Sequence, residues 1–143
     1  MLQPKINKTF SSEFIADFVL SNDKDDVFKS AKKNRDEFVN AIRRLNHIDH
    51  IIVYSKDGQL CGVFGWFFIK EENKHEVGKQ IWRLPDNLTD GDILYLAFIL
   101  TIEKCDLIAT KRIFEDLGYR KRINKIRGFS HDRWYEHRVY DKE

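Results

Sequence analysis

Apolar residues recur at helical spacing through the first third of the chain. Ser11 or Ser12 can cap a short helix, whose apolar face consists of Phe14, Ile15, Phe18 and Val19. A second, longer helix is predicted to start at Asn22, with an apolar face of Phe28, Ala31, Phe38, Ile42 and Leu45. Charged residues occupy its opposite face, which is typical of an amphipathic helix packed on a sheet.

The pattern changes to that of strands after residue 50. Residues 51–54 and 60–69 flank a tight-turn signal, Lys56-Asp57-Gly58, so they are predicted to form a hairpin. Residues 79–84 alternate between polar and apolar side chains and predict a third strand that ends at Pro85. Residues 93–100 are almost wholly apolar, which favours a central fourth strand covered on both faces.

One helix and two strands are predicted to complete the fold. The helix covers residues 106–117 and is stopped by Gly118, and the strands cover residues 120–127 and 134–140 around a turn at 128–133. This order predicts an α+β fold with an antiparallel-dominated central sheet. With no linker or repeat, the pattern predicts a single domain over residues 1–143.

Composition and cysteine usage narrow the classes of protein. Apolar residues make up 42% and charged residues 34%, a globular balance, and a net charge of +2 argues neither for nor against nucleic acid. Residues 1–10 lack the apolar run of a signal peptide, and the run at 93–102 is shorter than the roughly 20 residues of a membrane helix. Cys61 and Cys105 form no CxxC pair. We therefore expect a cytoplasmic protein with reduced thiols, away from the membrane.

The element order resembles that of the GNAT acyltransferase superfamily. Residues 110–119 are similar to a GNAT helix end, with Phe114-Glu115 followed by Leu117-Gly118-Tyr119. Residues 38–128 are also distantly similar to the toxin-activating lysine acyltransferases and to reduced, phage-encoded GNAT-like proteins. The matching positions are Ala41-Ile42-Arg43, Asp57-Gly58, Gly65-Trp66, Glu72-Asn73 and Gly91-Asp92. The resemblance implies transfer of an acyl group from acyl-coenzyme A to an amine, such as a protein lysine.

The same resemblance implies where the coenzyme and the catalytic groups lie. The backbone of Ala97, Phe98, Ile99 and Leu100 would pair with the pantetheine arm, and Lys104 would hold phosphate. Tyr119 and Tyr95 are candidates for the acid that protonates the leaving thiolate, with core packing as the alternative for either ring. His47 is a third catalytic candidate, with a structural or solvated role as its alternative. His47 and His50 have only Asp49 beside them, so no metal site is predicted.

Two features favour a second function, that of a GNAT-shaped binding module without catalysis, encoded by a phage or mobile element. GNAT proteins carry a glycine-rich phosphate loop after the fourth strand, whereas residues 101–106 contain no glycine. The C-terminal segment is rich in cations and aromatic residues, so Arg127, Arg133 and Lys121 are candidates to contact nucleic acid or an acidic protein. A solvated, charged strand edge is the simpler interpretation of the same segment.

Overall fold

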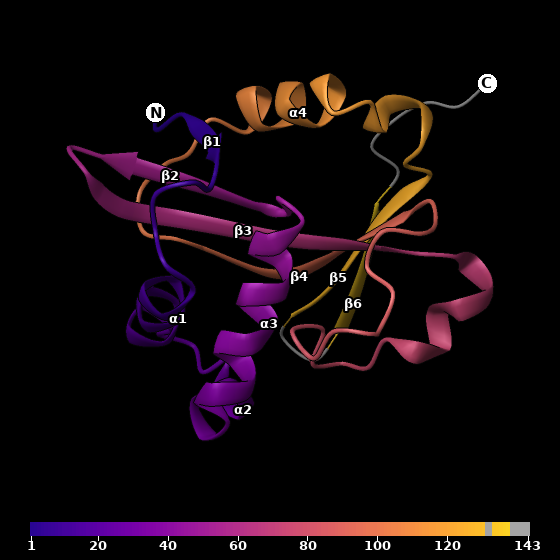
Figure 1. The fold of residues 1–143 in the computed structure, drawn as a ribbon, viewed down its shortest axis with the longest axis horizontal. Coiled ribbons are helices and arrows are strands. Elements are labelled where there is room, and N and C mark those ends of the chain that lie inside the picture. Colours follow the sequence, from indigo (N-terminus) through magenta and orange to yellow (C-terminus); the bar gives the residue numbers. More distant parts are fainter. Residues whose placement is uncertain (131–132, 138–143) are drawn as a thin grey trace.

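The computed structural model describes residues 1–130 and 133–137, in which the strands form one six-stranded sheet (Figure 1). Neighbouring strands follow the order β1-β2-β3-β4-β5-β6, and only β4 and β5 are parallel. The elements are β1 (Pro4–Ile6), α1 (Ser12–Ser21), α2 (Lys29–Lys33), α3 (Arg35–His47), β2 (Ile51–Lys56), β3 (Gln59–Ile69), η1 (Glu71–Glu76), β4 (Ile93–Thr101), α4 (Leu107–Asp116), η2 (Tyr119–Lys121), β5 (Lys125–Ser130) and β6 (Arg133–His137). The predicted α+β class with a mainly antiparallel sheet is confirmed.

Helices cover both faces of the sheet, with α1, α2 and α3 on one face and α4 on the other (Figure 1). The side chains of a strand alternate between these faces. Val53, Phe67 and Ile93 accordingly pack in the core on the α1–α3 side. Their chain neighbours Ile52, Phe68 and Leu94 pack in the core on the α4 side. This two-sided burial explains why β3 and β4 are almost continuously apolar.

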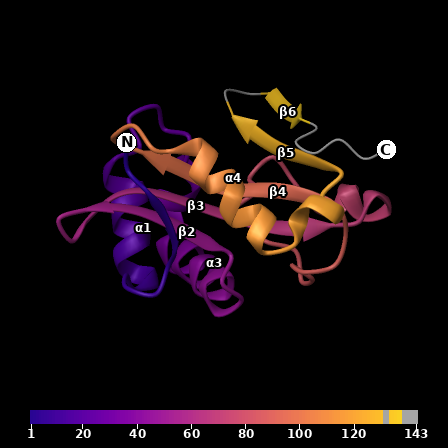
Figure 2. The same ribbon diagram turned by 90° about the horizontal axis from the view of Figure 1, so that it is seen from above.

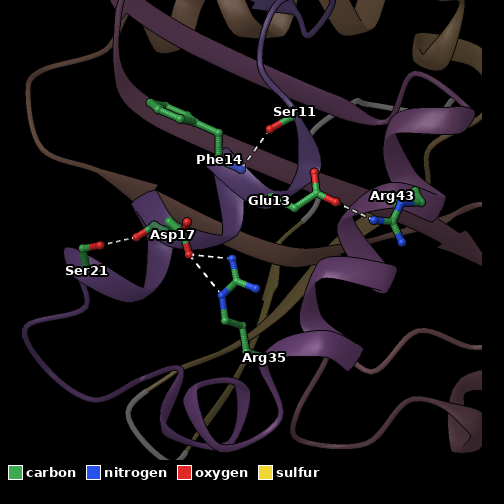
Figure 3. A network of polar contacts seen from close by, with 7 residues as sticks. All are labelled: Ser11, Glu13, Phe14, Asp17, Ser21, Arg35 and Arg43. Carbon is green, nitrogen blue, oxygen red and sulfur yellow. Dashed lines mark hydrogen bonds and ion pairs between the residues drawn. The ribbon is translucent and has the colours of Figure 1, made fainter.

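Helix α1 is held to α3 by buried apolar side chains. Two exposed ion pairs also join the helices, as Figure 3 shows. Ser11 is one of the two predicted caps of α1, and its hydroxyl accepts the N–H of Phe14 at 3.1 Å. Arg35 lies 2.9 Å from Asp17, and Arg43 lies 2.5 Å from Glu13. Because these pairs are exposed, each contributes about 0–1 kcal/mol, and the apolar contacts between the helices supply most of the stability.

The prediction of one long helix from Asn22 is wrong. Residues 22–28 form a turn around Asp23, whose buried carboxylate accepts the N–H of Val27 at 3.0 Å and that of Phe28 at 2.8 Å. A second interruption at Asn34, with φ −132° and ψ 51°, separates α2 from α3. Short polar side chains offer the backbone such alternatives to helical hydrogen bonds, and here they prevail.

The predicted third strand at residues 79–84 is also wrong. This segment is a loop in which Ile81 and Trp82 are each 4% exposed and pack in the core on the α1–α3 side. The indole N–H of Trp82 donates to the Ser30 hydroxyl at 3.0 Å. The alternation of polar and apolar residues therefore arises from a loop that is anchored by two apolar side chains.

Two further differences concern the strands β1 and β5. The three-residue strand β1, which the pattern did not predict, pairs with Ile52, Val53 and Tyr54. The strand predicted at 120–127 begins only at Lys125, because Tyr119 and Ile123 turn inward to the core on the α4 side. The predicted turn at 128–133 is therefore strand as far as Ser130, and residues 138–140 of the last predicted strand lie outside the described residues.

Candidate functional site

The parallel strands β4 and β5 separate soon after they meet (Figure 2). They pair in register at Ile93 with Lys125, Leu94 with Ile126, and Tyr95 with Arg127. Beyond Tyr95, no strand of residues 1–130 or 133–137 pairs with this edge of β4. The backbone from Leu96 to Thr101 therefore offers N–H and C=O groups along an open edge.

A β-bulge bends β4 where the strands separate. Gly65 of β3 pairs with Phe98 and the next residue, Trp66, pairs with Leu96, so Ala97 is the extra residue. As a result, Ala97 and Phe98 both face the core on the α1–α3 side, although they are adjacent in the strand. The bulge changes which way the side chains point at the start of the open edge.

A groove of about 1120 Å³ lies along the open edge. One wall consists of residues 96–102, at the end of β4 and just after it, together with Gly128 of β5. The other consists of residues 22–30, which form a turn and the start of α2, and of the loop at 79–82. The apolar part of the lining includes Phe28, Trp82 and Phe98. Its volume is slightly above the range of roughly 300–1,000 Å³ that is usual for small-molecule sites. The groove therefore has room for a ligand as large as a nucleotide coenzyme.

The charged side chains of the groove lie mostly on the turn that replaces the predicted helix start. Three acidic and three basic residues line it: Asp23, Asp25, Asp26, Lys24, Lys29 and Lys79. Asp23 is used to hold the turn, and Asp26 lies 3.0 Å from Lys32. Sequence reasoning missed this group because it placed these residues on a helix. Their density of Asn and Asp was the signal for a turn.

The structure places the predicted coenzyme-binding residues in two groups. Ala97, Phe98, Ile99 and Leu100 all line the groove. Lys104 is exposed beyond the end of β4 and is not part of the lining, and its backbone carbonyl accepts the N–H of Leu2 at 3.0 Å.

The start of α4, next to Lys104, is closed by the protein itself. The Asp106 carboxylate accepts the N–H of Ala109 at 3.0 Å and a hydrogen bond from the Gln3 side chain at 3.1 Å. The backbone hydrogen bond is the largest cause of the lowered pKa of Asp106. A carboxylate thus occupies the helix end at which a phosphate would otherwise bind.

The predicted tyrosines are buried and do not line the groove. Tyr119 is 7% exposed on the α4 side, where its hydroxyl accepts the indole N–H of Trp66 at 3.3 Å. Burial raises the pKa of Tyr119. Tyr95 is fully buried on the other face, and its hydroxyl accepts a hydrogen bond from Arg127 at 2.7 Å. Each hydroxyl therefore has a partner inside the protein.

The two histidines near the start of β2 have different surroundings. His47 is exposed at the end of α3 and lines a second hollow, of about 760 Å³, with Arg43, Arg44 and residues 86–89. His50 is buried, stacks on the Trp66 ring at 4.9 Å, and its Nδ1 lies 3.0 Å from the Trp66 carbonyl oxygen. Burial lowers the pKa of His50 to about 4. His47 is thus outside the groove, as are both predicted tyrosines.

Two cations of the C-terminal segment, Lys125 and Arg127, have acidic partners within the protein. Lys125 lies 3.0 Å from Glu71 and 3.6 Å from Glu136, and the Arg127 side chain is only 15% exposed. Lys121 is exposed on the η2 turn. The structure describes the backbone of Arg133 but not its side chain. The high positive charge of this stretch is therefore partly used in contacts within the protein.

Neither cysteine lines the groove. Cys61 and Cys105 are free thiols, and burial raises the pKa of each. Among the described side chains of residues 1–130 and 133–137, no group of three His, Cys, Asp or Glu is placed to hold a metal ion. Within the same ranges, no helix is both long and apolar enough to cross a membrane.

No protein-family model matches this sequence, and no curated protein is significantly similar to it.

Proposed function

We propose that this chain is a GNAT-type acyltransferase that binds acyl-coenzyme A in the groove between β4 and β5 and acylates an amine. The observation that carries the proposal is the separation of β4 from β5 after three parallel pairs, with a bulge at Ala97 beside the opening. An extended ligand with amide groups can pair with such an edge as an added strand would. The pantetheine arm of coenzyme A is a ligand of this kind.

The size of the groove supports the same occupant. Six residues of open edge, 96–101, span about 20 Å at the usual rise of a strand. The apolar wall that includes Phe28 and Trp82 suits the carbon chain of the arm and the acyl group. At the far end of the strand, the exposed Lys104 is the proposed contact for phosphate.

The proposed reaction is a direct attack on the thioester. The amine nitrogen attacks the carbonyl carbon, the C–S bond breaks as the C–N bond forms, and the proton lost by the amine is returned to the sulfur. Among the Tyr, His and Cys side chains that the structure describes, which do not include those of Tyr135 and His137, none lines the groove. Asp25 and Asp26 are the exposed carboxylates in its lining, and we assign the acceptance of the amine proton to one of them.

The alternative, a nucleic-acid- or protein-binding module without catalysis, is not proposed. It relied on the cations of the C-terminal hairpin being available to a partner. Lys125 and Arg127 instead lie beside Glu71, Glu136 and Tyr95, so their charges are already partly compensated.

A ligand-induced shift in melting temperature tests the proposal. Acetyl-coenzyme A at 100 times its dissociation constant should stabilise the protein by about 2.7 kcal/mol. A Cβ added at Gly128 would lie 3.5 Å from Leu96, so Gly128→Leu should fill the gap between the strands and remove the shift. Gly78→Leu is the matched control, since a Cβ at Gly78 would meet nothing within 4 Å. Absence of a shift in the wild type with any acyl-coenzyme A or free coenzyme A would reject the proposal.

A further inference from the structure

One guanidinium group lies at the last pair of β4 and β5 before they separate. The Arg127 Nη1 donates to the Tyr95 hydroxyl across the two strands, at 2.7 Å. The centre of the same guanidinium lies 4.5 Å from the Trp134 ring centroid and 5.5 Å from that of Tyr95. Tyr95 is itself stacked on Phe67 at 5.5 Å, with an angle of 7° between the rings. Arg127 is therefore hydrogen-bonded to Tyr95, a side chain that packing in the core already holds in place.

The same residue also reaches β6. Arg127 pairs with Glu136 in the antiparallel ladder, and its Nε lies 3.3 Å from a Glu136 carboxylate oxygen. This is an ion-pair distance at an angle that makes no hydrogen bond, since Nε is buried without a hydrogen-bond partner among the described residues. Arg127 thus connects β4 to β6 from a position on β5.

These contacts end where the groove begins. The next residues along the two strands, Leu96 and Gly128, both line it. Arg127 therefore lies at the last β4–β5 pair before the strands separate, one residue before the groove. We infer that Arg127 is a positioning residue that fixes the width of the groove by clamping Tyr95 of β4 to Trp134 and Glu136 of β6.

The chemistry of arginine suits this role better than that of another cation. A guanidinium can donate hydrogen bonds in its plane and stack on aromatic rings with its faces, whereas an ammonium group lacks that plane. Its 15% exposure leaves little of the side chain accessible to an external phosphate. The inference rests on the proposed function for its effect on the coenzyme, but the clamp itself can be measured without a ligand.

Four variants separate clamping from general stability. Arg127→Met removes the charge and the hydrogen bond, Arg127→Lys keeps the charge, and Tyr95→Phe removes only the hydroxyl that accepts the bond. Arg122→Met is the matched control, because Arg122 also lies over an aromatic ring, that of Phe68 at 3.8 Å, and donates to the Gly91 carbonyl at 3.0 Å. Arg122 does not line the groove.

Hydrogen exchange of the ligand-free proteins gives the first readout. Arg127→Met and, to a smaller extent, Tyr95→Phe should speed amide exchange in residues 93–95 and 125–128 relative to the β2–β3 ladder. Arg127→Lys should restore part of the protection, and Arg122→Met should leave the β4–β5 ladder as in the wild type. If Arg127→Met and Tyr95→Phe both exchange like the wild type there, the clamp is refuted. Tyr95→Phe alone decides the matter if Arg127→Met does not fold.

Coenzyme A binding, measured by calorimetry, gives the second readout. The dissociation constant should rise about tenfold or more in Arg127→Met and stay within about twofold in Arg122→Met, since loss of a preformed groove raises the cost of binding. Equal weakening in both variants would show a general loss of stability and overturn the positioning role. If the wild type binds no coenzyme A, the proposed function fails, and hydrogen exchange alone decides the clamp.

Discussion

The Phe98 ring lies directly against the backbone of Gly65, so a Cβ added to Gly65 would stand 2.7 Å from two of the ring carbons. The two residues are paired across β3 and β4 beside the bulge at Ala97. The ring also makes an edge contact with Phe38 of α3, at 5.9 Å between centroids. The absence of a side chain at Gly65 thus lets Phe98 seat the bulged strand against the helices.

Gly65→Ala should therefore destabilise the protein by about 1–3 kcal/mol, the usual cost of overpacking a core. It should also weaken coenzyme binding, because Phe98 and the bulge have to move. Urea unfolding measures the first effect. Gly78→Ala, at an open position, serves as control and should stay within about 0.5 kcal/mol of the wild type. A Gly65→Ala protein of unchanged stability would show that Phe98 can move away without cost.

Two glycines in turns should differ sharply in their tolerance of alanine. Gly91 has φ +124°, and a Cβ there would lie 2.2 Å from the backbone carbonyl carbon of Ile69. Gly58 has φ +78° in the β2–β3 turn, and its Cβ would meet nothing within 4 Å. We expect Gly58→Ala to cost about 1 kcal/mol, for its backbone conformation alone. Gly91→Ala should cost several times more, which thermal unfolding of the pair would show. Equal costs would mean that the loop before β4 adapts.

His50 makes the stability of the fold dependent on pH. The unfolded chain takes up a proton at the ordinary pKa of 6.5, whereas burial lowers the pKa in the folded protein to about 4. The unfolded state therefore binds more protons between these values, and stability should fall as pH decreases from 6.5 towards 4. The slope from this one group can reach about 1.4 kcal/mol per pH unit. Asp49 and Arg122 are the charged groups that act on His50, in opposite directions.

His50→Phe should flatten this part of the pH profile, because it removes the titrating group and keeps a flat ring beside Trp66. Unfolding by urea at several pH values between 4.5 and 7.5 gives both profiles. Lowered pKa values of Glu13, Glu71 and Asp106 add acid sensitivity to both proteins, so the difference between them isolates His50. Parallel profiles would show that the folded protein protonates His50 without penalty.

Much of the fold could be predicted from local signals. Ser11 caps α1, Asp106 caps α4, and Gly118 with φ +82° follows the end of α4. Each of these features depends on residues that are close together in the chain, and apolar spacing identified the remaining faces. Errors arose where a side chain changes the backbone locally, as Asp23 does, or where a loop is anchored from a distance, as Trp82 is by Ser30.

The candidate site could be predicted only in part. The apolar run at 93–100 predicted the strand, and the resemblance to GNAT proteins assigned its residues 97–100 to the coenzyme. The opening beside it depends on the register of Tyr95 with Arg127, which are 32 residues apart. The burial of Tyr119 is hidden in the same way, because its partner Trp66 is 53 residues away in the sequence. A basic or aromatic residue type therefore indicates a possible ligand contact, but its tertiary partners decide whether the side chain is available.

Tyr119→Phe distinguishes packing from catalysis at the tyrosine singled out by the family resemblance. The change leaves the Trp66 indole N–H without its acceptor and should cost about 1–3 kcal/mol, because the donor stays buried. Turnover per folded molecule should stay unchanged, since the hydroxyl does not line the groove. Urea unfolding and an acyl-transfer assay on the same preparations test the two statements. A loss of about 100-fold in turnover with intact stability would instead identify Tyr119 as a general acid.

The central claim is that the open edge of β4 receives the pantetheine arm of an acyl-coenzyme A. Hydrogen exchange of the backbone amides of residues 96–101, with and without saturating acetyl-coenzyme A, tests it most directly. We predict slower exchange at alternate amides of this stretch, as expected when a ligand pairs with one edge of a strand, and no such change in Gly128→Leu. Unchanged exchange along 96–101 in the presence of bound coenzyme, or protection confined to α4 or to the C-terminal hairpin, would contradict the claim.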